Sequence, residues 1–299
     1  MKIKLLHNRD IDLPRWDNII LGASNSRVYA ESWYLDIIHP DWMGIIYNDY
    51  EYVMPVIVSR KWGISYLFQP TYAQQHGIFP TSTPKITFEI LESLQKYYSY
   101  FNLSLNALNV DVAYRYQVEE RKNYILSLQL QVEDIWQGYN SHTKRYVKKA
   151  IRSCNVSKHV DAGDYLQLKQ EFGPKGLKSK NLAKLKLIIL KAMEQNRGLI
   201  YGAYSHRNEL IAAAFFIIEP KRITYLNSVS NSEGKETRAM YAIVNQFITE
   251  HAGQNYLLDF EGSNIEGIAR FFEGFGAQPE TYQHIRYNHL PWYLKLFKK

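Results

Sequence analysis

The sequence predicts an α+β protein made of two tandem halves, each a mixed, mostly antiparallel sheet flanked by helices. In the second half, three strand-like runs at 199–204, 210–218 and 222–229 are separated only by the turn-like segments SHRNE and EPK. Such close spacing is typical of an antiparallel meander. Amphipathic helix patterns precede and follow this meander, and the first half repeats the order of elements weakly.

The first half contains the weaker copy of the pattern. Pro84 stands where a helix would begin, a position that suits its fixed φ. The predicted elements are a helix at 31–39, strands at 43–47, 52–60 and 64–68, a helix at 86–100, and a strand at 103–108.

The second half contains the stronger copy. Gly198, Gly253 and Gly274 follow helical patterns and are expected to end them. Polar segments near 120–140 separate the halves, so we predict domains 1–130 and 131–299. Around the meander, we predict helices at 141–154, 164–172, 180–196 and 238–252, a strand at 256–260, a helix after Ser263, and a strand at 282–287.

Composition narrows the class of protein. The 299 residues include one cysteine, Cys154, which excludes an internal disulfide and a cysteine-based metal cluster. No His/Asp/Glu set has metal-ligand spacing, so no metal is expected. No run approaches the ~18 apolar residues of a membrane span, and the polar start is unlike a secretory signal, so we expect a cytoplasmic protein. The terminal HLPWYLKLFKK leaves peripheral membrane contact open, and the net charge of +7 favours anionic partners.

Two acids stand where a strand passes into a helix. Asp259 and Glu261 are two residues apart, so on an extended strand they would point to the same side. Ser263 and Glu266 have capping-box spacing at the start of the following helix. The acids could act as a base or anchor an ammonium group at an active site. Alternatively, Asp259 caps backbone amides and Glu261 pairs with a lysine.

A polar loop precedes the helix at 238–252. A helix N-terminus offers unpaired amides to an anion, and Lys235 and Arg238 add positive charge there. Asn231, Gly234 and Thr237 complete the candidate anion site. The alternative is that this loop is only a connector.

The helix at 141–154 is strongly basic. Arg145, Lys148 or Lys149, and Arg152 share one face, and no acid occurs before Asp161. This face could bind a phosphate-rich substrate, such as a nucleotide-linked precursor or the acceptor arm of a tRNA. A solvated surface is the alternative.

Two segments resemble a known family. HTKRYVKKAIRSCNVS is similar to the basic helix of the Fem peptidoglycan aminoacyltransferases, and DFEGS with GIARFFEGFGA is similar to their Asp-Phe-x-Gly segment and the helix after it. Glu273 stands where that family often has lysine. The element order over 135–290 resembles the GNAT acyltransferase fold. In the donor loop of that fold, Gly234 matches the usual pattern, whereas Asn231 and Glu236 depart from it.

The resemblance implies a function. It implies two GNAT-like halves and transfer of an acyl or aminoacyl group to an amine, with a cell-wall or other anionic precursor as acceptor. Acyl-CoA would be the donor, held at residues 231–238, and aminoacyl-tRNA is the alternative. Gln74, Gln75 and His76 lie in QPTYAQQHGIF, which resembles a loop of bacterial members of the group and is assigned to substrate binding. The competing hypothesis is a catalytically silent GNAT-like module that binds an anionic partner.

Overall fold

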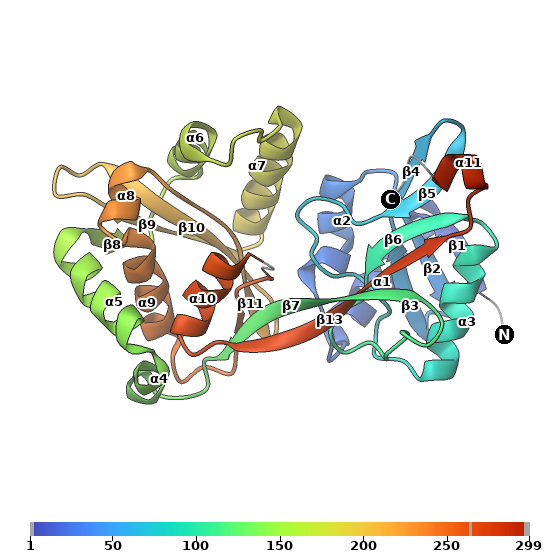
Figure 1. Cartoon of the computed structure of the whole chain (residues 1–299), viewed down its shortest axis with the longest axis horizontal. Helices are drawn as coiled ribbons and strands as arrows, with labels where there is room; N and C mark the ends of the chain where they lie inside the picture. Colours follow the sequence, from blue (N-terminus) through green and yellow to red (C-terminus); the bar gives the residue numbers. More distant parts are fainter. Residues whose placement is uncertain (1–2, 263–264, 296–299) are drawn as a thin grey trace. The chain divides into compact units, whose positions relative to one another are not determined.

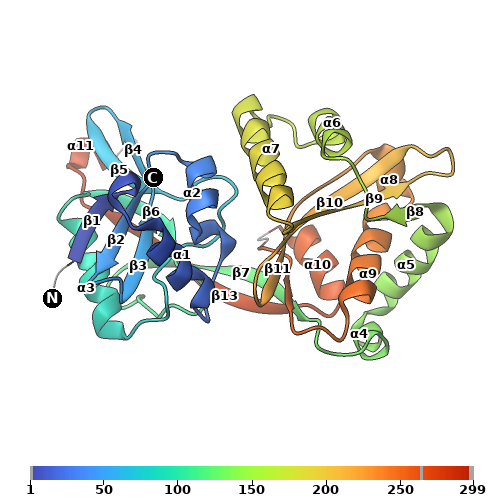
Figure 2. The same cartoon turned by 180° about the vertical axis from the view of Figure 1, so that it is seen from behind.

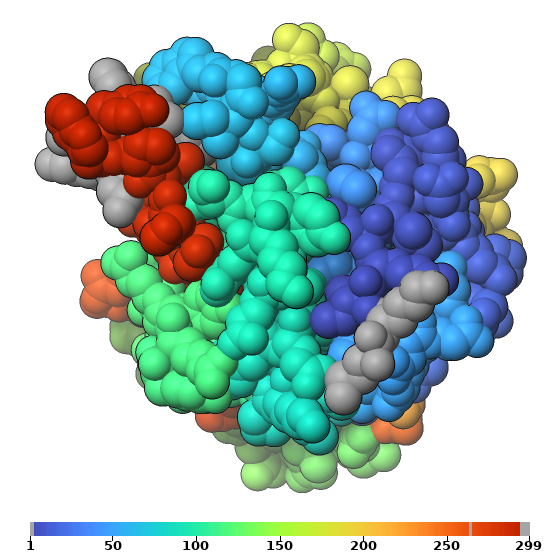
Figure 3. Space-filling view, turned by 90° about the vertical axis from the view of Figure 1, so that its right-hand side faces the viewer, coloured from blue at the N-terminus to red at the C-terminus, as the bar shows by residue number. Residues whose placement is uncertain are grey.

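The computed structural model describes residues 3–262 and 265–295, and the chain divides into two compact units. Unit 1 comprises Met1–Arg121 with Thr281–Lys299, and unit 2 comprises Lys122–Glu280. The division predicted from the sequence, at residue 130, places the last strand in the second half, whereas the structure assigns residues after 280 to unit 1. Figure 3 looks onto unit 1, where residues from the beginning (blue) and the end (red) of the chain share one face. Within the described residues, no helix has the length and apolar composition needed to cross a bilayer.

Unit 1 contains strands from two sheets. The first sheet is antiparallel, with β2 between β1 and β3. In the second set of strands, β5 pairs with β4 antiparallel and with β6 parallel, and residues 284–288 of β13 pair with β6 antiparallel. The strands are β1 (Ile3–His7), β2 (Met43–Tyr47), β3 (Tyr52–Val56), β4 (Val58–Lys61), β5 (Ile64–Phe68), β6 (Tyr100–Ser104) and β13 (Gln278–Asn288).

The helices of unit 1 cover these strands. Helix α3 begins at Pro84, as predicted, and the Thr83 side chain caps it by accepting a hydrogen bond from the Ile86 amide. Its apolar face packs into the core formed with β2, β3 and β6. The helices are α1 (Leu13–Gly22), α2 (Ser32–Ile38), α3 (Pro84–Gln95) and α11 (Trp292–Lys295), with 3₁₀ turns η1 (Asn8–Asp10) and η2 (Val28–Ala30).

Unit 2 is built on a sheet with the order β7-β12-β11-β10-β9-β8. Strands β9, β10 and β11 form the predicted antiparallel meander, β12 runs parallel to β11, and β7 pairs with β12 antiparallel. The sequence analysis missed β7. The strands are β7 (Gln117–Ser127), which begins in unit 1, and β8 (Asn155–Ser157), β9 (Gly198–Tyr204), β10 (Leu210–Ile218), β11 (Arg222–Ser230) and β12 (Leu257–Asp259).

Helices cover both faces of the meander. Figures 1 and 2 show α6 and α7 on one face and α5 and α9 on the other. On the α9 face, the rings of Phe216 on β10 and Phe247 on α9 stack with centroids 3.9 Å apart. The helices are α4 (Val132–Gly138), α5 (Ser141–Ser153), α6 (Ala162–Phe172), α7 (Ser179–Glu194), α8 (Ser232–Glu236), α9 (Ala239–His251) and α10 (Glu266–Gly274). The predicted α+β class is confirmed.

Candidate functional site

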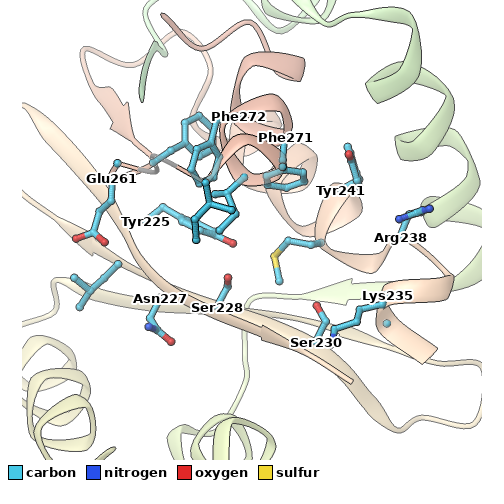
Figure 4. A pocket seen from close by; sticks show the side chains of 18 residues that line it. Tyr225, Asn227, Ser228, Ser230, Lys235, Arg238, Tyr241, Glu261, Phe271 and Phe272 are labelled. Atoms are coloured by element: carbon cyan, nitrogen blue, oxygen red, sulfur yellow. The ribbon is translucent and has the colours of Figure 1, made fainter. Parts of the chain in front are cut away.

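The main pocket of unit 2 lies where β11 and β12 separate. The two strands pair only from Arg222 to Thr224 on β11 and from Leu257 to Asp259 on β12. Beyond this pairing, a pocket of about 580 Å³ opens between β11, the segment after β12, α10, and the start of α9 (Figure 4). The divergence of two parallel strands therefore creates the cavity.

A β-bulge in β11 sets the orientation of its open edge. Phe215 of β10 pairs with Asn227 and Phe216 pairs with Tyr225, so Leu226 is an extra residue. Directly after the bulge along the chain, the Asn227 side chain faces α6. Its Oδ1 accepts a hydrogen bond there from the Tyr165 hydroxyl at 2.8 Å.

The backbone of β11 beyond the bulge faces the gap. The amide of Asn231 donates to the carbonyl of Ile211, which makes 231 and 211 a hydrogen-bonded pair. Hydrogen-bonded and non-hydrogen-bonded pairs alternate in an antiparallel ladder. Ser228 and Ser230 therefore belong to non-hydrogen-bonded pairs and direct their N–H and C=O groups away from β10. Both residues line the pocket.

One end of the pocket is aromatic. Phe260 and Phe272 stack at 4.8 Å. The Phe271 ring continues this wall toward Arg238, where it meets the Tyr241 ring edge to face at 4.7 Å (Figure 4). Tyr225 joins them, and burial raises the pKa of its hydroxyl, so that this group stays neutral. This wall suits an apolar part of a ligand.

The other end carries positive charge. Lys235 and Arg238 are exposed at the mouth of the pocket, and the Arg238 guanidinium lies 4.8 Å from the ring centroid of Tyr146 on α5. Arg238 adopts a left-handed conformation (φ 66°) as the N-cap of α9, which begins without a side-chain cap. The cations therefore stand beside the positive end of a helix dipole.

The sequence analysis places a phosphate site at residues 231–237, but most of the backbone amides there are already hydrogen-bonded within the protein. These residues form the short helix α8, and four of their amides are already bonded to acceptors within unit 2. The bonds run from Asn231 to the Ile211 carbonyl, from Gly234 to the Asn231 side chain, from Lys235 to the Asn231 carbonyl, and from Thr237 to the Glu233 carbonyl. These four amides are therefore not available to a phosphate, whereas the side chains of Lys235 and Arg238 are exposed.

Gly234 has a packing role. A Cβ atom at this position would lie 2.2 Å from the carbonyl oxygen of Ile211, so a side chain cannot fit without backbone movement. A larger residue at position 234 is therefore expected to disturb the fold as well as the pocket.

The two predicted acids do not point to the same side. Strand β12 ends at Asp259, and Glu261 adopts φ 60°. Asp259 is 1 % exposed and forms an ion pair with Arg222, while its Oδ1 accepts a hydrogen bond from the Glu261 amide at 2.8 Å. Burial alone would lower the pKa of Arg222, but the charges of Asp259, Glu280 and Glu219 raise it. Glu261 is half-buried and lines the pocket.

The predicted capping box joins Ser263 and Glu266 at the start of α10. Helix α10 begins at Glu266 with Ile265 as its N-cap and without a side-chain cap, and Glu266 pairs with Arg270 instead. Ser263 lies outside the described residues. Gly274 ends the helix as predicted, and Gly276 follows with φ 81°.

Sequence reasoning missed Lys169 on α6. Its side chain is buried at 5 % exposure, and its Nζ donates to the Ser228 carbonyl at 2.7 Å. Burial lowers its pKa to about 8. The helical spacing indicates this burial, because Lys169 stands four residues after Tyr165, on the helix face that also buries Ala162 and Leu168.

The basic face of α5 forms a groove of its own. Arg145, Lys148, Lys149 and Arg152 are exposed and, with Lys144, line a groove of about 710 Å³. In the part of the chain that the structure describes, none of them pairs with a carboxylate. Lys149 donates to the carbonyl of Glu236 on α8 at 3.0 Å, which joins this face to the cationic end of the main pocket.

The predicted loop residues lie in unit 1. Gln75 and His76 are buried, and Gln74 is half-buried. The Gln75 side chain accepts a hydrogen bond from the Ala107 amide at 3.0 Å, and the His76 amide donates to the Ser104 carbonyl at 3.0 Å. Their contacts hold the loop in place. Across the described residues, no three His, Cys, Asp or Glu side chains gather as metal ligands.

Comparison with known proteins identifies the fold. No family model and no curated protein match the sequence. The structure of FemX matches with a TM-score of 0.67 at 10% identity and covers 100% of both chains. The C-terminal domain of a putative lysylphosphatidylglycerol synthetase from Agrobacterium fabrum matches with a TM-score of 0.57 at 10% identity, over 97% of this chain and 95% of that one. A GNAT-family acetyltransferase from Colwellia psychrerythraea matches with a TM-score of 0.54 at 11% identity, over 96% and 100%. At the level of the fold, the predicted Fem-like GNAT resemblance is confirmed.

Proposed function

We propose that the protein is an acyltransferase that moves an acyl or aminoacyl group from a phosphate-bearing donor to an amine. The observation that carries this proposal is the pocket at the open edge of β11, with cations at one end, an aromatic wall at the other, and Glu261 beside it. A single ligand with a charged arm and an apolar reactive end fits this polarity.

The donor would bind with its phosphates near Lys235 and Arg238. Both side chains can form charge-assisted hydrogen bonds to phosphate, and the dipole of α9 adds to the attraction. The acyl group would then extend along β11 toward Phe271 and Phe272.

The open edge of β11 would stabilise the reacting carbonyl. The backbone N–H groups of Ser228 and Ser230 face the gap, and fixed donors of this kind stabilise the negative charge that develops on the carbonyl oxygen. The amine nitrogen forms a bond to the carbonyl carbon, and the bond from that carbon to the donor's sulfur or oxygen breaks. Glu261 would accept the proton of the amine, and the leaving group takes up a proton.

Two donors share the required chemistry. Acyl-CoA and aminoacyl-tRNA each present an activated acyl group on a phosphate-bearing arm. The basic groove of α5 adjoins the pocket through Lys149 and Glu236, so it could hold further phosphates of the larger donor or of an anionic acceptor. Because both donors are made inside the cell, the proposal places the protein in the cytoplasm.

A second function is favoured by the groove itself. The cations of α5 have no carboxylate partner among the described residues, so a module without catalytic activity could use them to bind a polyanion. In that case the main pocket would not carry out chemistry.

An assay of both donors distinguishes these functions. The purified protein is incubated with acetyl-CoA or with a mixture of aminoacyl-tRNAs, together with a panel of amines, and acylated products are detected by mass spectrometry. We expect transfer from one donor class, with loss of transfer in Arg238→Ala and normal transfer in Lys175→Ala, an exposed cation outside the pocket. Binding of a polyanion without transfer from either donor would instead favour the silent module.

A further inference from the structure

Lys169 is a buried cation that has no role in the reaction proposed above. It is 5 % exposed, and its one hydrogen bond goes to a neutral acceptor, the Ser228 carbonyl. No carboxylate pairs with it in the described part of the chain. Buried lysines are rare without such a partner, because desolvation penalises the charged form.

The ammonium group lies at the open edge of β11. The Ser228 carbonyl points away from β10, toward the gap in which β12 no longer pairs with β11. Because the Lys169 Nζ is 2.7 Å from this carbonyl oxygen, it lies beside that gap, although Lys169 itself does not line the pocket. Ser228 and Glu261, on opposite sides of the gap, both line the pocket.

The lysine approaches from the face opposite the donor site. Lys169 belongs to α6, which packs on one face of the sheet, whereas Lys235 and Arg238 precede α9 on the other face (Figure 2). Asn227, held by Tyr165, faces the same side as α6. We therefore assign a ligand group at Lys169 to the acceptor, because the donor phosphates are assigned to the α9 side.

We infer that Lys169 binds a carboxylate carried by the amine acceptor, so that the protein acylates an amino acid or a peptide rather than a simple amine. This inference rests on the proposed acyltransferase function. An ammonium offers three N–H donors and the Ser228 carbonyl takes one, which leaves donors for a carboxylate. The carboxylate supplies the counter-charge that the buried ammonium lacks, and burial strengthens the pairing. Burial lowers the pKa of Lys169 to about 8, and a bound carboxylate would favour the charged form again.

Paired acceptors test the inference. Glycine, lysine and glycylglycine are each compared with their C-terminal amides as acceptors, using the donor that supports transfer, and kcat/KM is expressed per unprotonated amine. A charge-assisted hydrogen bond of about 1.5–3 kcal/mol predicts a preference of about 10- to 100-fold for the carboxylates. Lys169→Met should abolish this preference, and Lys169→Arg should retain part of it.

Tyr165→Phe is the matched control. It removes the neighbouring hydrogen bond between α6 and β11 without changing charge, so it should keep the full preference for carboxylates. If Lys169→Met keeps the wild-type preference, or if the wild type accepts amides as well as carboxylates, the inference is overturned.

Direct binding separates this inference from the proposed function. Calorimetry measures whether the same amino acids bind the wild-type protein more tightly than their amides do, and whether Lys169→Met loses the difference. Carboxylate binding that depends on Lys169 without any acyl transfer would contradict the proposed function and leave the carboxylate site standing. Acyl transfer that does not depend on Lys169 would overturn the carboxylate site and leave the proposed function standing.

Discussion

Arg222, the first residue of β11, and Asp259, the last residue of β12, form a buried ion pair across the short stretch in which the two strands pair. Asp259 also accepts a hydrogen bond from the amide of Glu261, and Glu280 contacts the Arg222 guanidinium at 3.3 Å. The pair therefore fixes the backbone that carries Glu261 into the pocket. Asp259 does not line the pocket, whereas Glu261 does.

Asp259→Asn should therefore destabilise unit 2. Removing one partner from a buried pair leaves the other charge uncompensated, at a cost of about 3–5 kcal/mol. Urea unfolding measures the change. Glu280→Gln is the control, because Glu280 is more exposed and leaves the pair of Arg222 and Asp259 in place. A loss no larger than in this control would show that the ion pair does not hold the strand end.

Gly234→Ala and Gly267→Ala compare the stability effect of a side chain at a tightly packed glycine and at an open one. Both glycines line the pocket, but a Cβ at Gly234 would meet the Ile211 carbonyl at 2.2 Å, whereas a Cβ at Gly267 has nothing within 4 Å. Gly234→Ala should lose about 1–3 kcal/mol of unfolding free energy. Gly267→Ala, in a helix, should stay unchanged or gain up to ~1 kcal/mol. Equal stability of the two variants would contradict this packing role for Gly234.

The cations at the mouth of the pocket should set donor affinity. Lys235→Ala and Arg238→Ala should each weaken binding of the active donor about tenfold, the equivalent of about 1.4 kcal/mol. The effect should shrink at high salt, because both side chains are exposed. Calorimetric titration at two salt concentrations checks this. If Lys175→Ala weakens binding as much, the attraction comes from net charge and not from this site.

Buried His76 should make unit 1 sensitive to acid. Burial lowers its pKa to about 4 from an ordinary value of 6.5. Between these values the unfolded chain binds a proton that the folded chain does not, so stability falls as pH falls from 6.5 to 4. His76→Asn should flatten this fall by up to about 1.4 kcal/mol per pH unit. His289→Asn, at an exposed position, should leave the slope unchanged, and an unchanged slope in His76→Asn would refute the assignment.

Most of the regular elements were predictable because their signals are local. The strands Met43–Tyr47 and Leu210–Ile218 have the bounds that their apolar runs predict. Strand β7 was missed because its first half, including VEERKN, is polar and mostly exposed, and it is recognised as a strand only by its partners. The placement of residues after 280 in unit 1 likewise depends on pairing between distant segments.

The candidate site was predictable in composition but not in geometry. The sequence analysis identified Glu261, Lys235 and Arg238, which line the pocket. It could not identify the turn at Glu261, which depends on the Asp259 side chain holding the Glu261 amide. It also could not show that Lys169 is buried, because burial of a lysine is decided by the packing of α6 on β11.

The proposed role of Glu261 as the general base of acyl transfer is tested by the rate of a single transfer in the Glu261→Gln variant. The variant and the wild type are saturated with the active donor, the acceptor amine is added, and product is counted by mass spectrometry while unfolding midpoints are measured in parallel. If Glu261 is the general base, the rate should be about 100-fold lower, with an unfolding midpoint close to that of the wild type. Transfer at the wild-type rate by a folded Glu261→Gln variant would contradict the assignment of this pocket as the site of acyl transfer.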